Sequence, residues 1–125
     1  MFKTRKDLVK APTVSSTGEE VFELVGSDEK LGGSSHHSLA YVVIPPHCSS
    51  VHHFHNTSEE TYFILKGQGK LIINDTEHIV RPGDAVLISP GDHHQIFTEG
   101  HDALEFIVTC APPWNQDDNI QVNND

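Results

Sequence analysis

Three side chains that could bind a metal ion lie close together in the middle of the sequence. His53 and His55 flank Phe54 in an apolar, β-prone run, and a carboxylate follows at Glu60. Because successive side chains of a strand point to opposite faces, residues two apart share a face, and both imidazoles would stand side by side. Two histidines at this spacing are more often solvated or hydrogen-bonded when no other ligand joins them.

Further ligand-type residues follow where turns could return the chain to this pair. Residues 56–58 are typical of a turn, after which Glu60 could face the two imidazoles. A later turn at residues 89–92 leads into His93 and His94, and one of these offers a third imidazole. The pattern therefore indicates a divalent-metal site, provided that the fold brings these segments together.

Short runs of branched and aromatic residues, separated by Gly, Pro, Asn and Asp, must position these side chains. They predict strands at residues 39–44, 51–56, 61–65, 70–73, 78–80, 84–88, 94–98 and 104–109, with an edge strand at 21–25. No segment of ten or more residues has a convincing helical period, so helices should be minor or absent. This pattern favours an antiparallel sandwich or barrel.

The length of 125 residues suits one domain with a single core. We expect an N-terminal extension over residues 1–20 and a β-barrel domain over residues 21–112. Residues 113–125 should form a polar, acidic and mobile tail, with Trp114 packed back on the barrel.

Charge and hydropathy exclude several classes of function. The net charge of −10 disfavours binding to nucleic acid or to anionic membranes. No apolar run approaches the ~18 to 20 residues of a membrane span, and no apolar stretch follows the basic N-terminus. We therefore expect a soluble, cytoplasmic protein. Cys48 and Cys110 lack the close spacing of a thiolate metal site and are expected to be reduced.

The spacing of these residues resembles the two motifs of the cupin superfamily. Matches to the first motif are His53, His55, Glu60 and Gly67, and matches to the second are Gly83, Gly91 and His94. Three positions depart from the motifs, none of them a ligand position: His47 replaces glycine, Ser89 replaces proline and Thr98 replaces asparagine.

The motif count also settles two ambiguities of register. It selects Glu60 over Glu59, because only Glu60 leaves six residues before Gly67, and it selects His94 over His93. Strand alternation then turns His93 away from the site, and His52 with it.

The resemblance implies an all-β fold, the double-stranded β-helix or jelly-roll barrel. It also implies one divalent transition metal (Mn, Fe, Ni, Co, Cu or Zn) per chain, bound by His53, His55, Glu60 and His94. In octahedral coordination, these four ligands would leave two positions for water, substrate or dioxygen. Members of the family are often homodimers, and residues 21–25 would be the candidate for strand exchange.

These expectations favour a small metal-dependent enzyme, with oxygenase, decarboxylase, isomerase or cyclase chemistry left open. Tyr62 shares a strand face with Glu60 and is a candidate proton donor, although a core-edge tyrosine with a solvated hydroxyl is the alternative. Few cations lie between residues 31 and 109, which disfavours phosphorylated substrates and leaves a small carboxylate or a neutral or aromatic molecule. A non-catalytic small-molecule-binding module and a structural barrel are the other possibilities.

Overall fold

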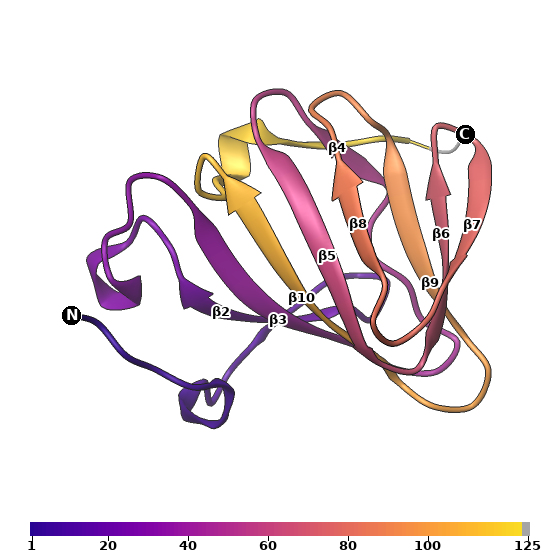
Figure 1. Ribbon diagram of the computed structural model, residues 1–125, viewed down its shortest axis with the longest axis horizontal. Helices are drawn as coiled ribbons and strands as arrows, with labels where there is room; N and C mark the ends of the chain where they lie inside the picture. Colours follow the sequence, from indigo (N-terminus) through magenta and orange to yellow (C-terminus); the bar gives the residue numbers. More distant parts are fainter. Residues whose placement is uncertain (124–125) are drawn as a thin grey trace.

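The computed structural model, which describes residues 1–123, has two antiparallel β-sheets packed against each other (Figure 1). One sheet has six strands in the order β1-β2-β3-β10-β5-β8, and the other has five in the order β11-β4-β9-β6-β7. The strands are β1 (Thr13–Val14), β2 (Glu20–Val25), β3 (Ser38–Ile44), β4 (His53–His55), β5 (Glu59–Lys66), β6 (Gln68–Ile73), β7 (Thr76–Val80), β8 (Ala85–Ile88), β9 (His94–Glu99), β10 (Leu104–Ala111) and β11 (Asn119–Gln121).

This arrangement confirms the predicted all-β jelly-roll fold. All nine predicted strands are present, within a few residues of the expected bounds. The helical segments of residues 1–123 are three single 3₁₀ turns, η1 (Lys6–Leu8), η2 (Glu29–Leu31) and η3 (Gln116–Asp118). In this part of the chain, no helix is long and apolar enough to span a membrane.

The core lies between the sheets and is built from alternate residues of the strands. In the six-stranded sheet, Phe106 of β10 pairs with Val42 of β3 on one side and with Ile64 of β5 on the other. These three side chains are at most 2% exposed, and Leu71 and Ile96 meet them from the five-stranded sheet with no exposure. The strands next to the site are therefore held by a well-packed apolar layer.

Two turn positions bear on the sequence motifs. Gly67, between β5 and β6, has a φ of +78°, and a Cβ atom there would collide with the carbonyl group of Ala103. His47, which replaces the motif glycine, has a φ of +67° and so adopts the left-handed conformation that glycine favours. The turn keeps its shape without glycine, at a cost of about 1 kcal/mol in backbone strain.

The two terminal segments belong to the sheets more fully than the sequence indicates. β1 pairs with β2, and the following turn is tied to the barrel because Ser49 donates its backbone N–H to the carbonyl of Thr17. At the other end, β11 pairs with β4 along its whole length (Figure 1). The expectation of a mobile tail is therefore wrong for residues 119–121.

The homodimer stays a prediction.

Candidate metal centre

Three strands carry the four residues that the motifs single out. His53 and His55 lie on β4, His94 begins β9, and Glu60 is the second residue of β5. β4 and β9 pair with His53 opposite His94, whereas β5 belongs to the other sheet. Gly91 donates a backbone hydrogen bond of 2.7 Å to the carbonyl oxygen of His55, which ties the turn before His94 to β4. The four side chains therefore meet between the sheets.

The nitrogen and oxygen atoms of these side chains converge on a small volume. Glu60 Oε1 lies 2.8 Å from His94 Nε2 and 3.1 Å from His55 Nε2. Its distance from His53 Nε2 is 4.0 Å. One ligand atom of each residue lies within 4.8 Å of the others. Because neighbouring ligands of an ion held at about 2.1 Å stand ~3 to 3.5 Å apart, this spacing is suited to a small divalent cation.

Backbone carbonyl groups orient two of the imidazoles. Nδ1 of His53 lies 2.7 Å from the carbonyl oxygen of Val51, and Nδ1 of His94 lies 2.8 Å from that of Asp92. A carbonyl oxygen only accepts, so each Nδ1 carries the hydrogen atom. In a neutral imidazole, Nε2 then presents its lone pair to the centre of the cluster, which is the state that a metal ligand needs.

The cluster has more acceptors than donors. His94 Nε2 faces the Glu60 carboxylate at 2.8 Å although Nδ1 already donates to a carbonyl, so either a proton or a cation must separate the two lone pairs. Both nitrogens of His55 are buried without a well-aligned hydrogen bond. Buried polar atoms rarely lack a partner, and a metal ion at the centre would satisfy Nε2 of His55, while Nδ1 faces Asp118. The residues present therefore fit a divalent metal ion.

Burial and mutual contact perturb the protonation of the cluster. Burial and the neighbouring His94 lower the pKa of His53 to about 4. Burial opposes the charged form of His55 as well, but the contact with Glu60 outweighs it and raises the pKa of His55 above its ordinary value. Burial likewise disfavours the carboxylate of Glu60, yet contacts with His55 and His94 hold its pKa well below the usual range. At neutral pH, Glu60 is therefore an anion and His53 is neutral.

We expect the metal affinity of the cluster to fall as the pH decreases, starting above the ordinary histidine pKa of ~6.5. Metal ions bind neutral imidazole, and the raised pKa of His55 makes it bind a proton at higher pH than an ordinary histidine. His53, with a pKa of about 4, competes only in acid. Chelator-competition titrations should show the dissociation constant rising about tenfold per pH unit once His55 protonates. A constant value between about pH 8 and pH 5 would contradict this expectation.

The structure places the alternative ligands outside the cluster. Glu59 is exposed, whereas Glu60 is 5% exposed. The ring of His93 stacks on Phe54 at a centroid distance of 4.5 Å and has an edge contact with His52 at 6.2 Å. Because Phe54 points away from the neighbouring ligand histidines, the three aromatic rings lie on the other face of the sheet, as strand alternation predicts.

Asp118 is a neighbour of the cluster that sequence reasoning missed. It ends η3 in the segment expected to be a mobile tail, and it accepts backbone hydrogen bonds from Thr57 and Ser58 at 2.9 and 3.0 Å. Burial opposes its charge, but these bonds outweigh it and lower the pKa of Asp118. Its Oδ2 lies 3.9 Å from Nδ1 of His55. Asp118 thus holds the turn between His55 and Glu60 and places a negative charge behind one imidazole.

Replacement of Asp118 by alanine is expected to weaken metal binding about tenfold. Residues that orient a ligand histidine from behind typically contribute 10- to 100-fold to affinity, and the lower part of this range is suited to a separation without a direct hydrogen bond. The measurement is a zinc titration against a chelator. Asp117→Ala, at the exposed neighbouring position, should leave the affinity unchanged. Equal affinities for the two variants would contradict a contribution of Asp118 to metal binding.

The side chain of Cys110 adjoins Glu60. Cys110 lies opposite Glu60 in the β5–β10 pairing and donates a hydrogen bond of 3.4 Å from its thiol to Glu60 Oε2. Burial, and the charge of Glu60, raise the pKa of this thiol. Cys110 and Cys48 are both free. The alternation that places Phe106 and Val108 on the inner face also places Cys110 there, so this neighbour could have been found from the sequence.

Tyr62 follows Glu60 on the same face of β5 and is more deeply buried than the sequence suggested. Only 3% of the residue is exposed, and its ring packs against Phe106 at a centroid distance of 4.7 Å. Burial and the charge of Glu60 raise the pKa of its hydroxyl well above the ordinary value. The hydroxyl at the core edge is therefore enclosed rather than solvated, and Tyr62 stays a candidate hydrogen-bond donor.

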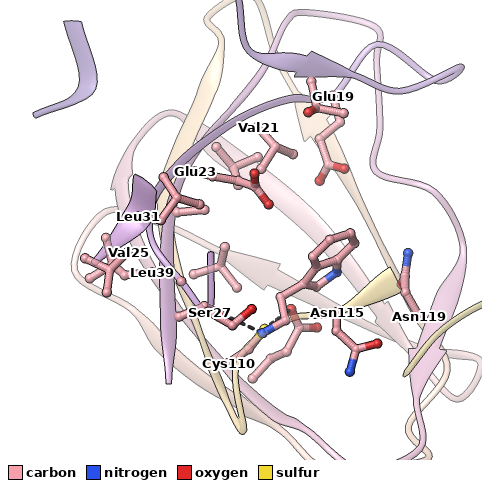
Figure 2. A pocket seen from close by; sticks show the side chains of 18 of the residues that line it. Glu19, Val21, Glu23, Val25, Ser27, Leu31, Leu39, Cys110, Asn115 and Asn119 are labelled. Atoms are coloured by element: carbon pink, nitrogen blue, oxygen red, sulfur yellow. Dashed lines mark hydrogen bonds between the residues drawn. The ribbon is translucent and has the colours of Figure 1, made fainter. Parts of the chain in front are cut away.

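A cavity of about 510 Å³ adjoins the cluster, between the inner face of the six-stranded sheet and the edge of the other sheet that β11 and β4 form (Figure 2). His53, Glu60 and Tyr62 form part of its wall, and most of the other side chains that line it are apolar. Pockets of ~300 to 1,000 Å³ next to a few polar groups are typical sites for small molecules. The cluster is therefore accessible to a ligand from the cavity.

Glu19 is a second residue that sequence reasoning missed. It lies in the turn between β1 and β2, within the expected N-terminal extension, and Figure 2 shows it on the opposite side of the cavity from Cys110. The turn is closed by hydrogen bonds between Ser15 and Glu19 in both directions, at 2.9 and 3.2 Å. Burial and the charge of Glu60 raise the pKa of Glu19 to about 7. A carboxyl group that changes charge near neutral pH therefore lines the cavity.

The chain is similar to the model of one protein family and to two relatives described below. The family model of the cupin domain matches residues 40–110, a span that contains all four residues of the cluster. An uncharacterised protein of Methanocaldococcus jannaschii is 30% identical over 118 residues, which cover 94% of this chain and 92% of that protein. The oxalate-binding protein of Thermotoga maritima is 32% identical over 70 residues, 56% of this chain and 58% of that protein.

Among solved structures, the polyketide cyclase RemF from Streptomyces resistomycificus has the same fold. It superposes with a TM-score of 0.81 at 24% sequence identity, and the match covers 100% of this chain and 87% of that one. This likeness shows that the two chains share one fold.

Proposed function

The chain belongs to the cupin domain family, and from this premise we propose that it is a metal-dependent enzyme that acts on a small molecule in the cavity beside the cluster. In this proposal, His53, His55, Glu60 and His94 bind one divalent transition metal ion. Mixed imidazole and carboxylate ligands are suited to Mn, Fe, Co, Ni, Cu or Zn.

The surplus of acceptors within the cluster is the observation that supports this proposal most directly. A structural group of buried histidines would be expected to satisfy its nitrogens with donors and acceptors of the protein. Here the Nε2 atoms of His94 and His55 both face the same carboxylate oxygen, at 2.8 and 3.1 Å. Because Nδ1 of His94 donates to a carbonyl group, Nε2 of His94 presents a lone pair to this oxygen. A cation would relieve that repulsion, and four protein ligands leave room for a substrate atom.

Different residues around the cluster would orient the metal ligands, contact the substrate and exchange a proton. When bound, a divalent ion would supply Lewis-acid polarisation of a substrate oxygen. Val51 and Asp92 hold the ligand tautomers of His53 and His94 through their carbonyl groups. The apolar wall, with Phe106 and Val108, excludes water from the substrate. Glu19 can hold or release a proton at its carboxyl group, on the opposite side of the cavity from Cys110.

A non-catalytic binding module is the second candidate function. The similarity to the oxalate-binding protein of Thermotoga maritima favours it, because that name describes binding alone. A binding module would use the same ion and cavity to retain a ligand unchanged. Titration of the zinc-loaded protein with oxalate tests this candidate directly.

The proposed function is tested by elemental analysis of protein purified without added metal, followed by incubation with a pool of small metabolites. We expect close to one transition-metal ion per chain and mass-spectrometric loss of a substrate signal with the appearance of a product. His94→Ala should lose both, whereas His93→Ala, on the other face, should keep both. Enrichment of a compound without conversion would favour the binding module, and no bound metal would contradict both candidates.

A further inference from the structure

The shape of the cavity follows from small residues on the inner face of the six-stranded sheet. Val108 of β10 pairs with Ala40 of β3, and Cys110 pairs with Ser38. These short side chains leave a space where Phe106 and Val42, one pair further along, fill the core. The space has a volume of about 510 Å³, so it could accept a molecule of one or two rings.

The charge of the wall restricts what this space can hold. The ionisable side chains that line it beyond the cluster include the carboxyl groups of Glu19, Glu23 and Asp28, and its described lining contains neither lysine nor arginine. Lys6, one of the few cations of the chain, lies over Phe22 and Tyr41. These two residues alternate with Val21, Glu23, Ala40 and Val42 of the cavity, so Lys6 is on the outer face.

Away from the metal cluster, an anionic group inside the cavity would therefore meet carboxylates without a lysine or arginine as counter-ion. A buried charge without a partner is costly, and carboxylates placed close together repel each other. A hydroxyl group, in contrast, could donate a hydrogen bond to Glu19 while the rest of the molecule contacts Val21, Val42 and Val108. The negative charge and the apolar side chains of the cavity lining thus both favour an uncharged molecule with a hydroxyl group.

We propose that the cavity binds an uncharged, largely apolar molecule that carries a hydroxyl group, and that Glu19 is the specificity-determining residue that excludes carboxylated molecules. This inference rests on the proposed function in taking the cavity as the substrate site. The sequence left open both small carboxylates and neutral or aromatic molecules as ligands. The inference goes further because it selects the neutral class.

The test compares two probes of matched shape, 2-naphthol and 2-naphthoate, at about pH 8, where Glu19 is ionised. Trp114 is the single tryptophan and lines the cavity, so its indole N–H signal in ¹H–¹⁵N NMR spectra reports binding there. The first titration uses the protein treated with EDTA, and the second uses the protein saturated with Zn²⁺. We expect the dissociation constant of 2-naphthol to be at least tenfold lower than that of 2-naphthoate in the first titration.

Three variants test whether Glu19 causes the preference for 2-naphthol over 2-naphthoate. Glu19→Gln should reduce the ratio of the two dissociation constants several-fold, whereas Glu20→Gln, which removes the same charge next to the cavity lining, should leave the ratio unchanged. Ala40→Leu should weaken the binding of both probes by filling the space, with zinc binding retained. The Glu20 and Ala40 variants separate loss of specific contacts from loss of the fold.

The outcomes distinguish this inference from the proposed function. Equal or tighter binding of 2-naphthoate by the EDTA-treated protein, no binding of either probe, or an unchanged ratio in Glu19→Gln would overturn the inference. None of these results depends on a metal ion. Failure of the protein to bind Zn²⁺ would overturn the proposed function instead, while the neutral selectivity of the cavity could still be observed.

Discussion

Replacement of Glu60 by glutamine is expected to weaken the binding of divalent metal ions by more than 100-fold. Glu60 supplies the only negative charge among the four residues that converge at the cluster, and its Oε1 atom is the nearest neighbour of two imidazole nitrogens. Loss of a residue that merely orients a ligand costs ~10- to 100-fold, so loss of the charged ligand itself should cost more. Glutamine has the same size, and its amide N–H can donate a hydrogen bond to the Nε2 lone pair of His94.

The measurement is equilibrium dialysis against zinc with elemental analysis, together with thermal unfolding. Wild-type protein at a zinc concentration 100 times the dissociation constant should gain ~2.7 kcal/mol of stability, and Glu60→Gln should gain almost none. Glu59→Gln is the matched control, because this substitution removes the same charge one residue away, at an exposed position. Retention of zinc by Glu60→Gln at wild-type affinity would rule out Glu60 as a ligand.

Replacement of Glu19 by glutamine is expected to raise the free energy of unfolding of the metal-free protein at about pH 8 by roughly 2 to 3 kcal/mol. Burial and the charge of Glu60 raise the pKa of Glu19 from 4.5 to about 7. The folded state therefore holds this proton more tightly than the unfolded state. Stability is unaffected below the unfolded pKa, falls as the pH rises from about 4.5 to 7, and stays lower above that range. Glutamine carries no charge and removes the penalty.

Urea unfolding at about pH 5 and pH 8 measures this effect. The variant and the wild type should have similar stability at the lower pH and should differ at the higher one. Glu20→Gln, at the neighbouring position, should show little pH-dependent difference. Zinc should reduce the benefit of Glu19→Gln, because a cation next to Glu60 cancels the part of the penalty that its charge causes. A benefit of the same size at both pH values would refute the raised pKa of Glu19.

The strands and the motif residues could be predicted because their signals are local. Alternation along β5 puts Glu60, Tyr62 and Ile64 on one face, and the structure buries all three. The same reasoning separates His53 and His55 from Phe54. Counting from Gly67 and Gly91 identified which glutamate and which histidine face inward, because turns with a φ of +78° and +87° fix the register of the strands beside them.

The sequence by itself therefore determined the all-β class, the strand faces and which four side chains could meet. Tertiary structure alone decided what surrounds them. Asp118 meets Thr57 and Ser58 across about 60 residues of chain, and Glu19 reaches the cavity from a segment that looked like an extension. Asp118 lies in no periodic run, and Glu19 precedes the strand predicted from the sequence, although it alternates with Val21 and Glu23 of the cavity lining. Their positions depend on contacts between segments far apart in the chain: β11 pairs with β4, and the turn between β1 and β2 is held by the hydrogen bond from Ser49 to Thr17.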